Sequence, residues 1–230
     1  MTTSYDAVVL AGGAARRLGG TDKPALSVGG RMLLDRVLGA CAAAGSTVVV
    51  GPRRPTARPV RWACEWPPGG GPLPALAAGL AALDDVHRSG AGAVPGPDRS
   101  GVVLVLAADL PFLTGDTVGA LVAALTAPRG REEEARGEAG DGTRWEGVML
   151  MDSGGRDQPL AAAYRVAALR RELALLGAEH GGLTGLPLRL LTGELALRRL
   201  ADPTGDASFD CDTWEDVAVA RARLDAVSEG

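Results

Sequence analysis

A short apolar run that ends in glycines opens the chain and restricts its fold more than any other feature. Val8 to Leu10 is unbroken and is followed after one alanine by Gly12 and Gly13. Such a run is typical of a strand that is buried on both faces, as in a parallel sheet. Apolar residues at helical spacing then predict a helix over Met32 to Ala44, and Thr47 to Val50 is a second buried strand. Strand, loop, helix and strand form the unit that builds parallel sheets, so the sequence predicts an α/β fold.

The rest of the chain continues the alternation of strands and helices. Further strands are predicted at Val60 to Ala63, Val102 to Leu106, Gly147 to Met151, Leu160 to Tyr164 and about Leu195 to Leu200. Further helices are predicted from Leu76 to about Val86, from near Thr114, at Val166 to Leu176, near Thr184 to Leu191, and from Thr213 onwards. A chain of 230 residues suits one sizeable α/β core, so residues 1–230 are expected to form a single domain.

One segment is not expected to join that core. Residues 127–144 mix charge with glycine and carry no apolar side chain larger than alanine and proline. Such a composition does not repay the entropy of ordering, so the segment is predicted to be a mobile surface loop.

The glycines after the first strand indicate a phosphate site. Gly12–Gly13 and Gly19–Gly20 bracket Arg16 and Arg17. Glycine lets backbone N–H groups approach an anion, and arginine offers phosphate a bidentate fork. The loop is neither a Walker loop nor a dinucleotide fingerprint, because it lacks both Gly-Lys-Ser/Thr and G-x-G-x-x-G. Lys23 is the only lysine among 24 basic residues. A single lysine among arginines indicates that this position requires a compact ammonium charge, and the alternative is that the lysine lies here by chance.

A carboxylate follows the most apolar strand. Asp109 comes just after Val102 to Leu106, V-V-L-V-L, and so lies past the carboxyl end of a buried strand, where open α/β sheets bind ligands. An aspartate in that position can hold a magnesium ion that also takes phosphate oxygens. The alternative is that Asp109 caps the next helix, although Thr114 is available as that cap.

Two more carboxylates lie near the end of the chain, in S-F-D-C-D-T-W-E-D-V. Asp210 and Asp212 alternate along an extended piece, so both are expected to face one side and could complete a metal site. Thr213, followed by acids in the first turn of a helix, is a capping pattern that accounts in part for Asp212 as well.

Composition excludes several classes of function. A net charge of −4 with no basic run argues against a nucleic-acid partner. Three distant cysteines without C-x-x-C indicate neither a disulfide framework nor a zinc site, and they fit a reducing cytoplasm. No apolar run approaches the ~20 residues of a membrane span, and no signal peptide is expected. No serine or cysteine has a histidine partner in a recognisable motif, so covalent catalysis is not expected.

The run from Leu10 to Lys23, L-A-G-G-A-A-R-R-L-G-G-T-D-K, matches L-A-G-G-x-x-x-R-x-G-G-x-D-K throughout. In these residues the chain resembles the MobA-like nucleotidyltransferases, most closely the molybdenum cofactor guanylyltransferases. Three further segments match that family: G-P-L-x-x-L at Gly71 to Leu76, D-x-P-F-L at Asp109 to Leu113, and D-x-D-T-x-E at Asp210 to Glu215, where Trp214 replaces a proline. The resemblance implies a single-domain, Rossmann-like three-layer sandwich with a mostly parallel central sheet, of the nucleotide-diphospho-sugar transferase type.

The resemblance also implies an activity and its residues. The family transfers GMP from GTP to the terminal phosphate of molybdopterin or Mo-molybdopterin and releases pyrophosphate. By resemblance the catalytic residues are Lys23, Arg17 and Asp109, and Mg²⁺ binds Asp109 and Asp212. The implied nucleotide-binding residues are Leu10, Ala11, Gly12, Gly13, Arg17, Lys23, Glu65, Gly71, Pro72, Leu73 and Asp109. Gln158 and Pro159 match a segment that in this family lies near the second substrate.

The identity of the donor nucleotide stays open at this stage. Leu10 to Gly13 favours GTP, because the similar cytidylyltransferases tend towards L-A-A-G. Gly51 stands where the guanylyl enzymes often have asparagine, and Glu65 followed by Trp66 stands where an aspartate is expected. A cytidylyltransferase and a nucleotide-binding regulator without turnover are the alternatives. The expected partners are GTP and molybdopterin, with neither nucleic acid nor membrane, in the cytoplasm, and with transient contact to molybdenum-insertion or molybdoenzyme chaperone proteins.

Overall fold

A seven-stranded sheet forms the centre of the computed structural model, which describes residues 3–13, 16–89, 101–127, 144–202 and 204–228. The strand order is β5-β4-β1-β6-β8-β7-β9. The strands are β1 (Asp6–Leu10), β4 (Thr47–Val50), β5 (Arg61–Ala63), β6 (Val102–Ala107), β7 (Gly147–Met151), β8 (Asp157–Arg165) and β9 (Leu197–Ala201). All pairs are parallel except the two that β8 makes with β6 and β7. A separate hairpin joins β2 (Ser27–Val28) to β3 (Arg31–Met32).

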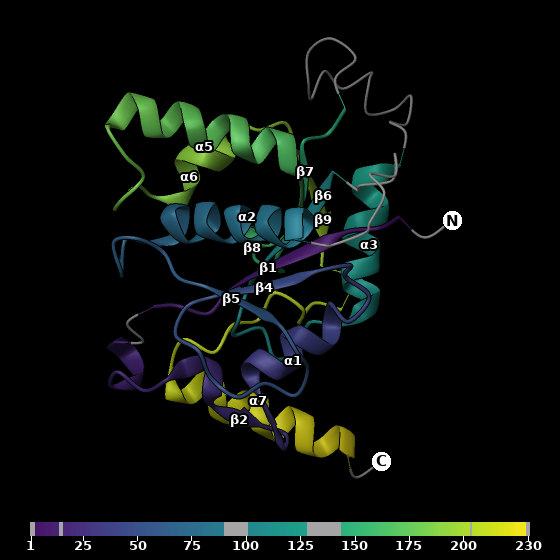
Figure 1. The fold of residues 1–230 in the computed structure, drawn as a ribbon. Coiled ribbons are helices and arrows are strands. Elements are labelled where there is room, and N and C mark those ends of the chain that lie inside the picture. The colour runs from purple at the N-terminus through teal and green to yellow at the C-terminus, as the bar shows by residue number, and fades with distance from the viewer. Residues whose placement is uncertain (1–2, 14–15, 90–100, 128–143, 203, 229–230) are drawn as a thin grey trace.

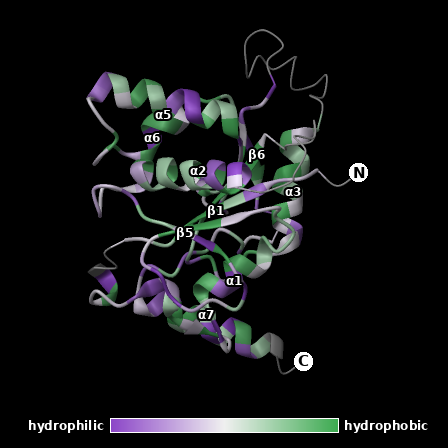
Figure 2. Cartoon of the chain, in the orientation of Figure 1, coloured by the Kyte–Doolittle hydropathy of each residue, from purple (hydrophilic) through white to green (hydrophobic). Residues whose placement is uncertain are grey.

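Helices cover both faces of this sheet (Figure 1). They are α1 (Leu33–Ala40), α2 (Pro72–Ser89), α3 (Gly115–Thr126), α5 (Val166–His180), α6 (Leu188–Gly193) and α7 (Trp214–Ser228), with short 3-10 turns η1 (Arg16–Leu18) and η2 (Lys23–Ala25). Successive residues of a strand point to opposite faces. Val9 accordingly packs in the cluster formed with α1 and α3, and Val8 in the cluster formed with α2, α5 and α6. Figure 2 shows the central strands as largely hydrophobic and the helices as mixed.

A third, smaller cluster fastens the end of the chain to its beginning. It consists of Leu18, Val28, Leu33, Cys211, Val217 and Ala220, each almost completely buried. In Figure 1 the yellow α7 lies beside the purple β2, and the two elements are in contact. The segment that precedes α7 is thereby held next to the glycine loop after β1.

The structure confirms the predicted α/β fold with a mostly parallel central sheet and flanking helices. Each predicted strand is present, but several boundaries were wrong; α6, for example, begins at Leu188 rather than near Thr184, and α5 ends at His180 rather than Leu176. The second long helix begins at Pro72 rather than after Leu76, because proline fits the first turn, where its missing N–H is not needed. The strand β8 begins at Asp157 rather than Leu160, because residues 157 and 158 pair with the end of β7 past a bulge. The helix α1 ends at Ala40 rather than near residue 44, and a turn follows it.

Two further expectations concern order and membranes. The expected mobile loop at 127–144 falls almost entirely on residues 128–143, which lie outside the described residues. Within the described part of the chain, no helix is long and apolar enough to cross a membrane.

Candidate active site

A cavity of about 620 Å³ opens at the carboxyl ends of β1 and β6. In an open α/β sheet, ligands bind at this edge because the loops leave neighbouring strands toward opposite faces. The cavity is lined by Leu10, Gly12, Gly13, Arg17, Lys23, Pro24, Glu65, Gly69, Gly71, Pro72, Ala75, Ala107, Ala108, Asp109, Leu160 and Asp212. Most residues that the sequence singled out are therefore brought together.

The chain from residue 11 to residue 23 follows β1, and we call it the phosphate loop; its described residues, 11–13 and 16–23, supply one wall of the cavity. Ala11 is buried, and its N–H donates to the Val50 carbonyl at 2.8 Å, which extends the pairing of β1 with β4 by one residue. Gly12 and Gly13 then line the cavity, and Gly13 has φ 132°, a conformation that favours glycine. Ala11 thus supports the wall from behind rather than facing the cavity.

Lys23 joins two aspartates that are far apart in the sequence. Its ammonium group contacts Asp109 Oδ2 closely and donates to Asp212 Oδ1 at 2.6 Å. Burial lowers the pKa of Lys23, but the two carboxylates outweigh that effect and hold its pKa above the ordinary value. The hydrogen bond from Lys23 in turn lowers the pKa of Asp212. The lysine is therefore a cation in direct contact with two carboxyl groups of the cavity.

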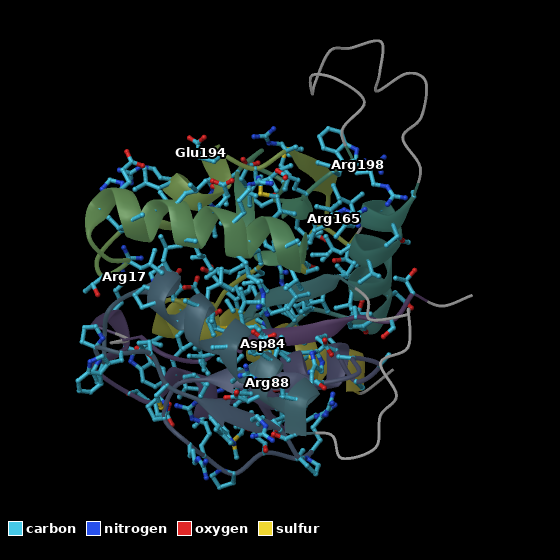
Figure 3. The ribbon with its side chains drawn as sticks, turned by 45° about the horizontal axis from the view of Figure 1, so that its top comes forward. Arg17, Asp84, Arg88, Arg165, Glu194 and Arg198 are labelled. Atoms are coloured by element: carbon cyan, nitrogen blue, oxygen red, sulfur yellow. The ribbon has the colours of Figure 1, made fainter. Side chains whose placement is uncertain are left out.

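Arg17 lies at the mouth of the cavity rather than inside it. Its side chain is 75% exposed, and Nη1 lies 3.6 Å from Asp212 Oδ2. In Figure 3 Arg17 lies on the opposite side of the view from Arg165 and Arg198. A loosely held, exposed guanidinium is free to turn toward an anion that enters.

The segment after β6 places Asp109 opposite the phosphate loop. Ala108 N–H donates to the Leu10 carbonyl at 3.1 Å, and the Asp109 carbonyl accepts from Cys211 N–H at 3.3 Å. Thr114 caps α3, because its hydroxyl accepts from Thr117 N–H at 3.2 Å. The alternative role of Asp109 as helix cap is thus excluded.

The structure separates the two alternating aspartates. Asp212 lines the cavity, whereas Asp210 does not. Burial raises the pKa of Asp210, and the charges of Asp212 and Asp109 add to that rise, so Asp210 lies within electrostatic reach of the cavity. Thr213 caps α7 in a reciprocal pair with Asp216, since each side chain accepts from the other's N–H. Asp212 takes no part in that cap.

The carboxylates fit a magnesium ion. Asp109 Oδ1 is buried and has no hydrogen-bond partner among the described residues. Asp212 reaches the same cavity from the other side of Lys23. No cluster of three or more candidate ligands occurs in the described part of the chain. Magnesium on a nucleotide needs only one or two protein carboxylates, because phosphates and water complete its shell.

Another part of the cavity wall comes from the segment before α2. Glu65, Gly71 and Pro72 line the cavity as predicted. Glu65 Oε1 accepts from Gly69 N–H at 3.1 Å, which fixes its carboxylate beside Gly12. Leu73, in the first turn of α2, is instead fully buried in the cluster that packs against Val8 and Val48.

The segment predicted to meet a second substrate is only partly at the cavity. Gln158 and Pro159 do not line it, but Leu160 does. Gln158 Nε2 donates to Asp152 Oδ2 at 3.1 Å, and the Pro159 carbonyl accepts from the Tyr164 hydroxyl at 2.9 Å. The Gln158 bond therefore joins the start of β8 to the turn after β7, whereas the Pro159 bond lies within β8.

Sequence reasoning missed the lining residues Pro24, Gly69, Ala75, Ala107 and Ala108, and it named Leu160 only as the last residue of the segment matched at Gln158 and Pro159. The antiparallel pairing of β8 with β6 places Ala161 opposite Leu106, so Leu160 lies beside Ala107 at the cavity edge. No local pattern marks small apolar residues of this kind, and only the strand register finds them.

None of the described cysteines lines the cavity. Cys211 is fully buried, and burial together with the charge of Asp109 raises the pKa of its thiol to about 12. The thiol is protonated at neutral pH and cannot act as a nucleophile. The site can position and neutralise phosphates instead.

Comparison with known proteins identifies the family. The family model described as the MobA-like NTP transferase domain matches residues 7–192, a range that contains the phosphate loop, Asp109 and β8. The chain belongs to this family. Of the site residues above, Asp212 alone lies beyond the matched range.

Curated relatives extend over nearly the whole chain. The molybdenum cofactor guanylyltransferase of Bradyrhizobium sp. (strain ORS 278) is 31% identical, covering 99% of this chain and 96% of that protein. The molybdenum cofactor guanylyltransferase of Nitrobacter hamburgensis is 32% identical, covering 97% of this chain and 95% of that protein. The predicted resemblance is therefore confirmed at the level of the family.

Solved structures confirm the fold. Molybdopterin-guanine dinucleotide biosynthesis protein A from Archaeoglobus fulgidus superposes with a TM-score of 0.63 at 18% identity, over 96% of this chain and 99% of that chain. The 2-C-methyl-D-erythritol 4-phosphate cytidylyltransferase from Thermus thermophilus superposes with a TM-score of 0.57 at 18% identity, over the same shares. The fold thus occurs both in a protein named for guanine dinucleotide biosynthesis and in a cytidylyltransferase.

Proposed function

We propose that this protein transfers GMP from GTP to the terminal phosphate of molybdopterin or Mo-molybdopterin, giving the guanine dinucleotide cofactor and pyrophosphate. One observation carries the proposal: Lys23 contacts Asp109 and Asp212 inside the cavity whose wall is Gly12 and Gly13. This arrangement of glycines, one ammonium group and carboxylates is suited to a triphosphate and its metal ion.

The reaction follows from positioning and charge. An oxygen of the acceptor phosphate forms a bond with the α-phosphorus of GTP, the bond from that phosphorus to the bridging oxygen breaks, and pyrophosphate leaves with that electron pair. The Lys23 ammonium counters the charge that grows on the phosphates, and Arg17 with the Gly12 and Gly13 amides holds the leaving pyrophosphate. A magnesium ion held by Asp109 and Asp212 would neutralise phosphate charge and orient the donor.

Guanine is the preferred base for two reasons. The curated relatives at 31% and 32% identity are guanylyltransferases. Glu65 also presents a carboxylate to the cavity, and a carboxylate accepts from the adjacent N–H and NH₂ donors of guanine, which cytosine and uracil lack as a pair. The 2-C-methyl-D-erythritol 4-phosphate cytidylyltransferase among the similar structures makes CTP the alternative donor.

Two measurements test the function. Thermal shifts with GTP, CTP, ATP and UTP, each with magnesium, should show the largest stabilisation by GTP, and preferential stabilisation by CTP would refute the donor assignment. Pyrophosphate release with GTP should then require molybdopterin. Nucleotide binding without molybdopterin-dependent release would instead indicate a regulator.

The proposal extends to the setting of the reaction. We place the enzyme in the cytoplasm, with magnesium as its metal and with transient contacts to molybdenum-insertion or molybdoenzyme chaperone proteins that would receive the product. Cross-linking in cells that make molybdoenzymes tests those contacts.

A further inference from the structure

The connection between β4 and β5, residues 51–60, lies against the start of the phosphate loop. Gly51 has φ 143°, and a Cβ on it would lie 2.9 Å from the carbonyl carbon and oxygen of Ala11. Real Cβ atoms do not approach backbone so closely, so glycine is needed at this position. The close approach brings the connection to the point where the phosphate loop leaves β1.

Arg54, in the same connection, joins the two ends of the phosphate loop. Its Nε and Nη2 donate to the two carboxylate oxygens of Asp22 at 3.1 and 2.8 Å. Its Nη1 donates to the Ala11 carbonyl at 3.4 Å. Ala11 immediately precedes Gly12, and Asp22 immediately precedes Lys23. One guanidinium group thus connects the glycine end of the loop to its lysine end.

The surroundings of Arg54 fix it in this role. Only 7% of its side chain is exposed, and its Cζ lies 5.8 Å from the centre of the Trp62 ring. Arg54 does not line the cavity, and its N–H groups are directed at Asp22 and the Ala11 carbonyl instead. The fork geometry is essential, since lysine cannot make two parallel bonds to a carboxylate and a third to a carbonyl.

We propose that Arg54 is a positioning residue for nucleotidyl transfer, which holds Gly12 and Lys23 in register by pairing with Asp22 and the Ala11 carbonyl. The inference rests on the proposed function, because it takes the phosphate loop to bind GTP. When the pairing is lost, the loop adopts its binding arrangement for a smaller fraction of the time. The apparent affinity for GTP falls by that same fraction, and saturating GTP restores the rate.

Three variants test the pairing kinetically: Arg54→Lys, Asp22→Asn and the two combined. Each single variant is expected to raise the KM for GTP about tenfold, while kcat at saturating GTP stays within about threefold of wild type. The double variant should be no worse than the more affected single variant, because both remove the same contact.

A matched control comes from another arginine–aspartate pair. Arg170 on α5 donates to Asp84 on α2 at 2.6 Å, and neither residue lines the cavity. In Figure 3 Asp84 lies near the middle of the view, below and to the right of Arg17. Arg170→Lys should leave the KM for GTP unchanged, which separates a local effect on the loop from the general loss of an ion pair.

Hydrogen exchange gives a readout that needs no nucleotide. Peptides covering residues 11–23 should exchange faster in Arg54→Lys and Asp22→Asn than in wild type and Arg170→Lys. Unchanged exchange together with a KM for GTP within twofold of wild type would overturn the proposal, as would a lower melting temperature with unchanged KM. If Arg54→Lys does not fold, the result for Asp22→Asn decides whether the pairing positions the loop. That variant is expected to fold, because the Asp22 side chain is 52% exposed. A wild-type enzyme that does not use GTP would refute the proposed function, whereas the loop exchange would still decide whether Arg54 braces the loop.

Discussion

The two halves of the sheet meet the cavity in different ways. In the half that we propose binds the nucleotide, here called the nucleotide half, β5, β4, β1 and β6 are parallel, and the chain that follows β1 and β6 supplies Gly12, Lys23 and Asp109. In the half that we propose meets the acceptor, here called the acceptor half, the strands β8, β7 and β9 contribute only Leu160 to the described lining, and the chain that follows β9 returns to place Asp212 beside Lys23. Charge is therefore concentrated on the nucleotide side, and the acceptor side offers an apolar edge.

Part of this difference follows from the direction of β8, since β7 and β9 run parallel to β6. The parallel strands end at the cavity, so the loops after them carry polar residues to one edge. The antiparallel β8 begins there instead, and its first residues are engaged in the hairpin with β7. Loops thus position the lining residues of the nucleotide side, and strand register positions the lining residue of the acceptor side. Because the charged residues lie mainly on the nucleotide side, substitutions there are expected to change the activity more.

The largest effect is expected at Lys23. Lys23→Ala should lower kcat/KM for pyrophosphate release on the order of a hundredfold, because it removes a cation that acts on the transferring phosphates. The measurement is steady-state pyrophosphate release with GTP and molybdopterin. A folded variant whose rate stays within a few-fold of wild type would refute the role of the lysine. It would also show that substitutions in the nucleotide half have no larger effect on the rate than those in the acceptor half.

The next effect concerns the base. Glu65→Gln should lower the preference for GTP over CTP about tenfold, since an amide replaces a carboxylate that accepts two guanine donors. Competition between the two nucleotides in the binding assay measures this ratio. An unchanged ratio would show that the base is read elsewhere, and the matched control is Glu179→Gln, on the exposed end of α5.

A smaller effect is expected on the acceptor side. Leu160→Ala should raise the KM for molybdopterin about fivefold and leave the KM for GTP unchanged. The substitution removes apolar contacts with the acceptor that contribute roughly one to two kcal/mol to its binding. Gln158→Ala, which alters the hairpin rather than the lining, should have a weaker effect on the same KM. The opposite order would support the second-substrate role that the family resemblance implies for Gln158.

The smallest effect is on stability. The pKa of Asp212 is lowered from its ordinary 3.8 and that of Lys23 is raised from 10.5, so their pairing stabilises the fold between these values. Its contribution is lost as pH falls through the lowered pKa of Asp212 or rises through the raised pKa of Lys23. Because Asp212 is 48% exposed, solvent screens the pair and Asp212→Asn should cost about 1 kcal/mol or less.

Thermal melts of wild type and Asp212→Asn at several pH values measure that contribution. The difference in melting temperature should be constant from about pH 5 to pH 9 and vanish in strong acid. A difference that grows in acid would contradict the assigned direction of the shift.

The sequence predicted the nucleotide half well for a physical reason. The residues of the phosphate loop are contiguous, and Asp109 follows a strand whose burial is evident from V-V-L-V-L. Position along the chain then fixes position in space, because parallel strands end at one edge. The attachment of α7, which brings Asp212 to Lys23, agrees with the family pattern but also required the packing of Leu18 against Val217.

The remaining features depended on long-range geometry. The role of Leu160 follows from the register of β8 with β6, which a bulge in the β7 pairing makes hard to infer. The contact of Arg54 with both ends of the phosphate loop joins residues 32 and 43 positions apart. No local pattern in the sequence distinguishes Arg54 from Arg53 beside it.

A crystal structure with a non-hydrolysable GTP analogue and Mn²⁺ would test the central claim most directly, because manganese is located by its anomalous signal. We predict that the triphosphate lies against Gly12 and Gly13, that Lys23 contacts it, and that the manganese peak lies at Asp109. A nucleotide bound elsewhere, or a triphosphate that neither Lys23 nor the Asp109-bound metal reaches, would contradict the account.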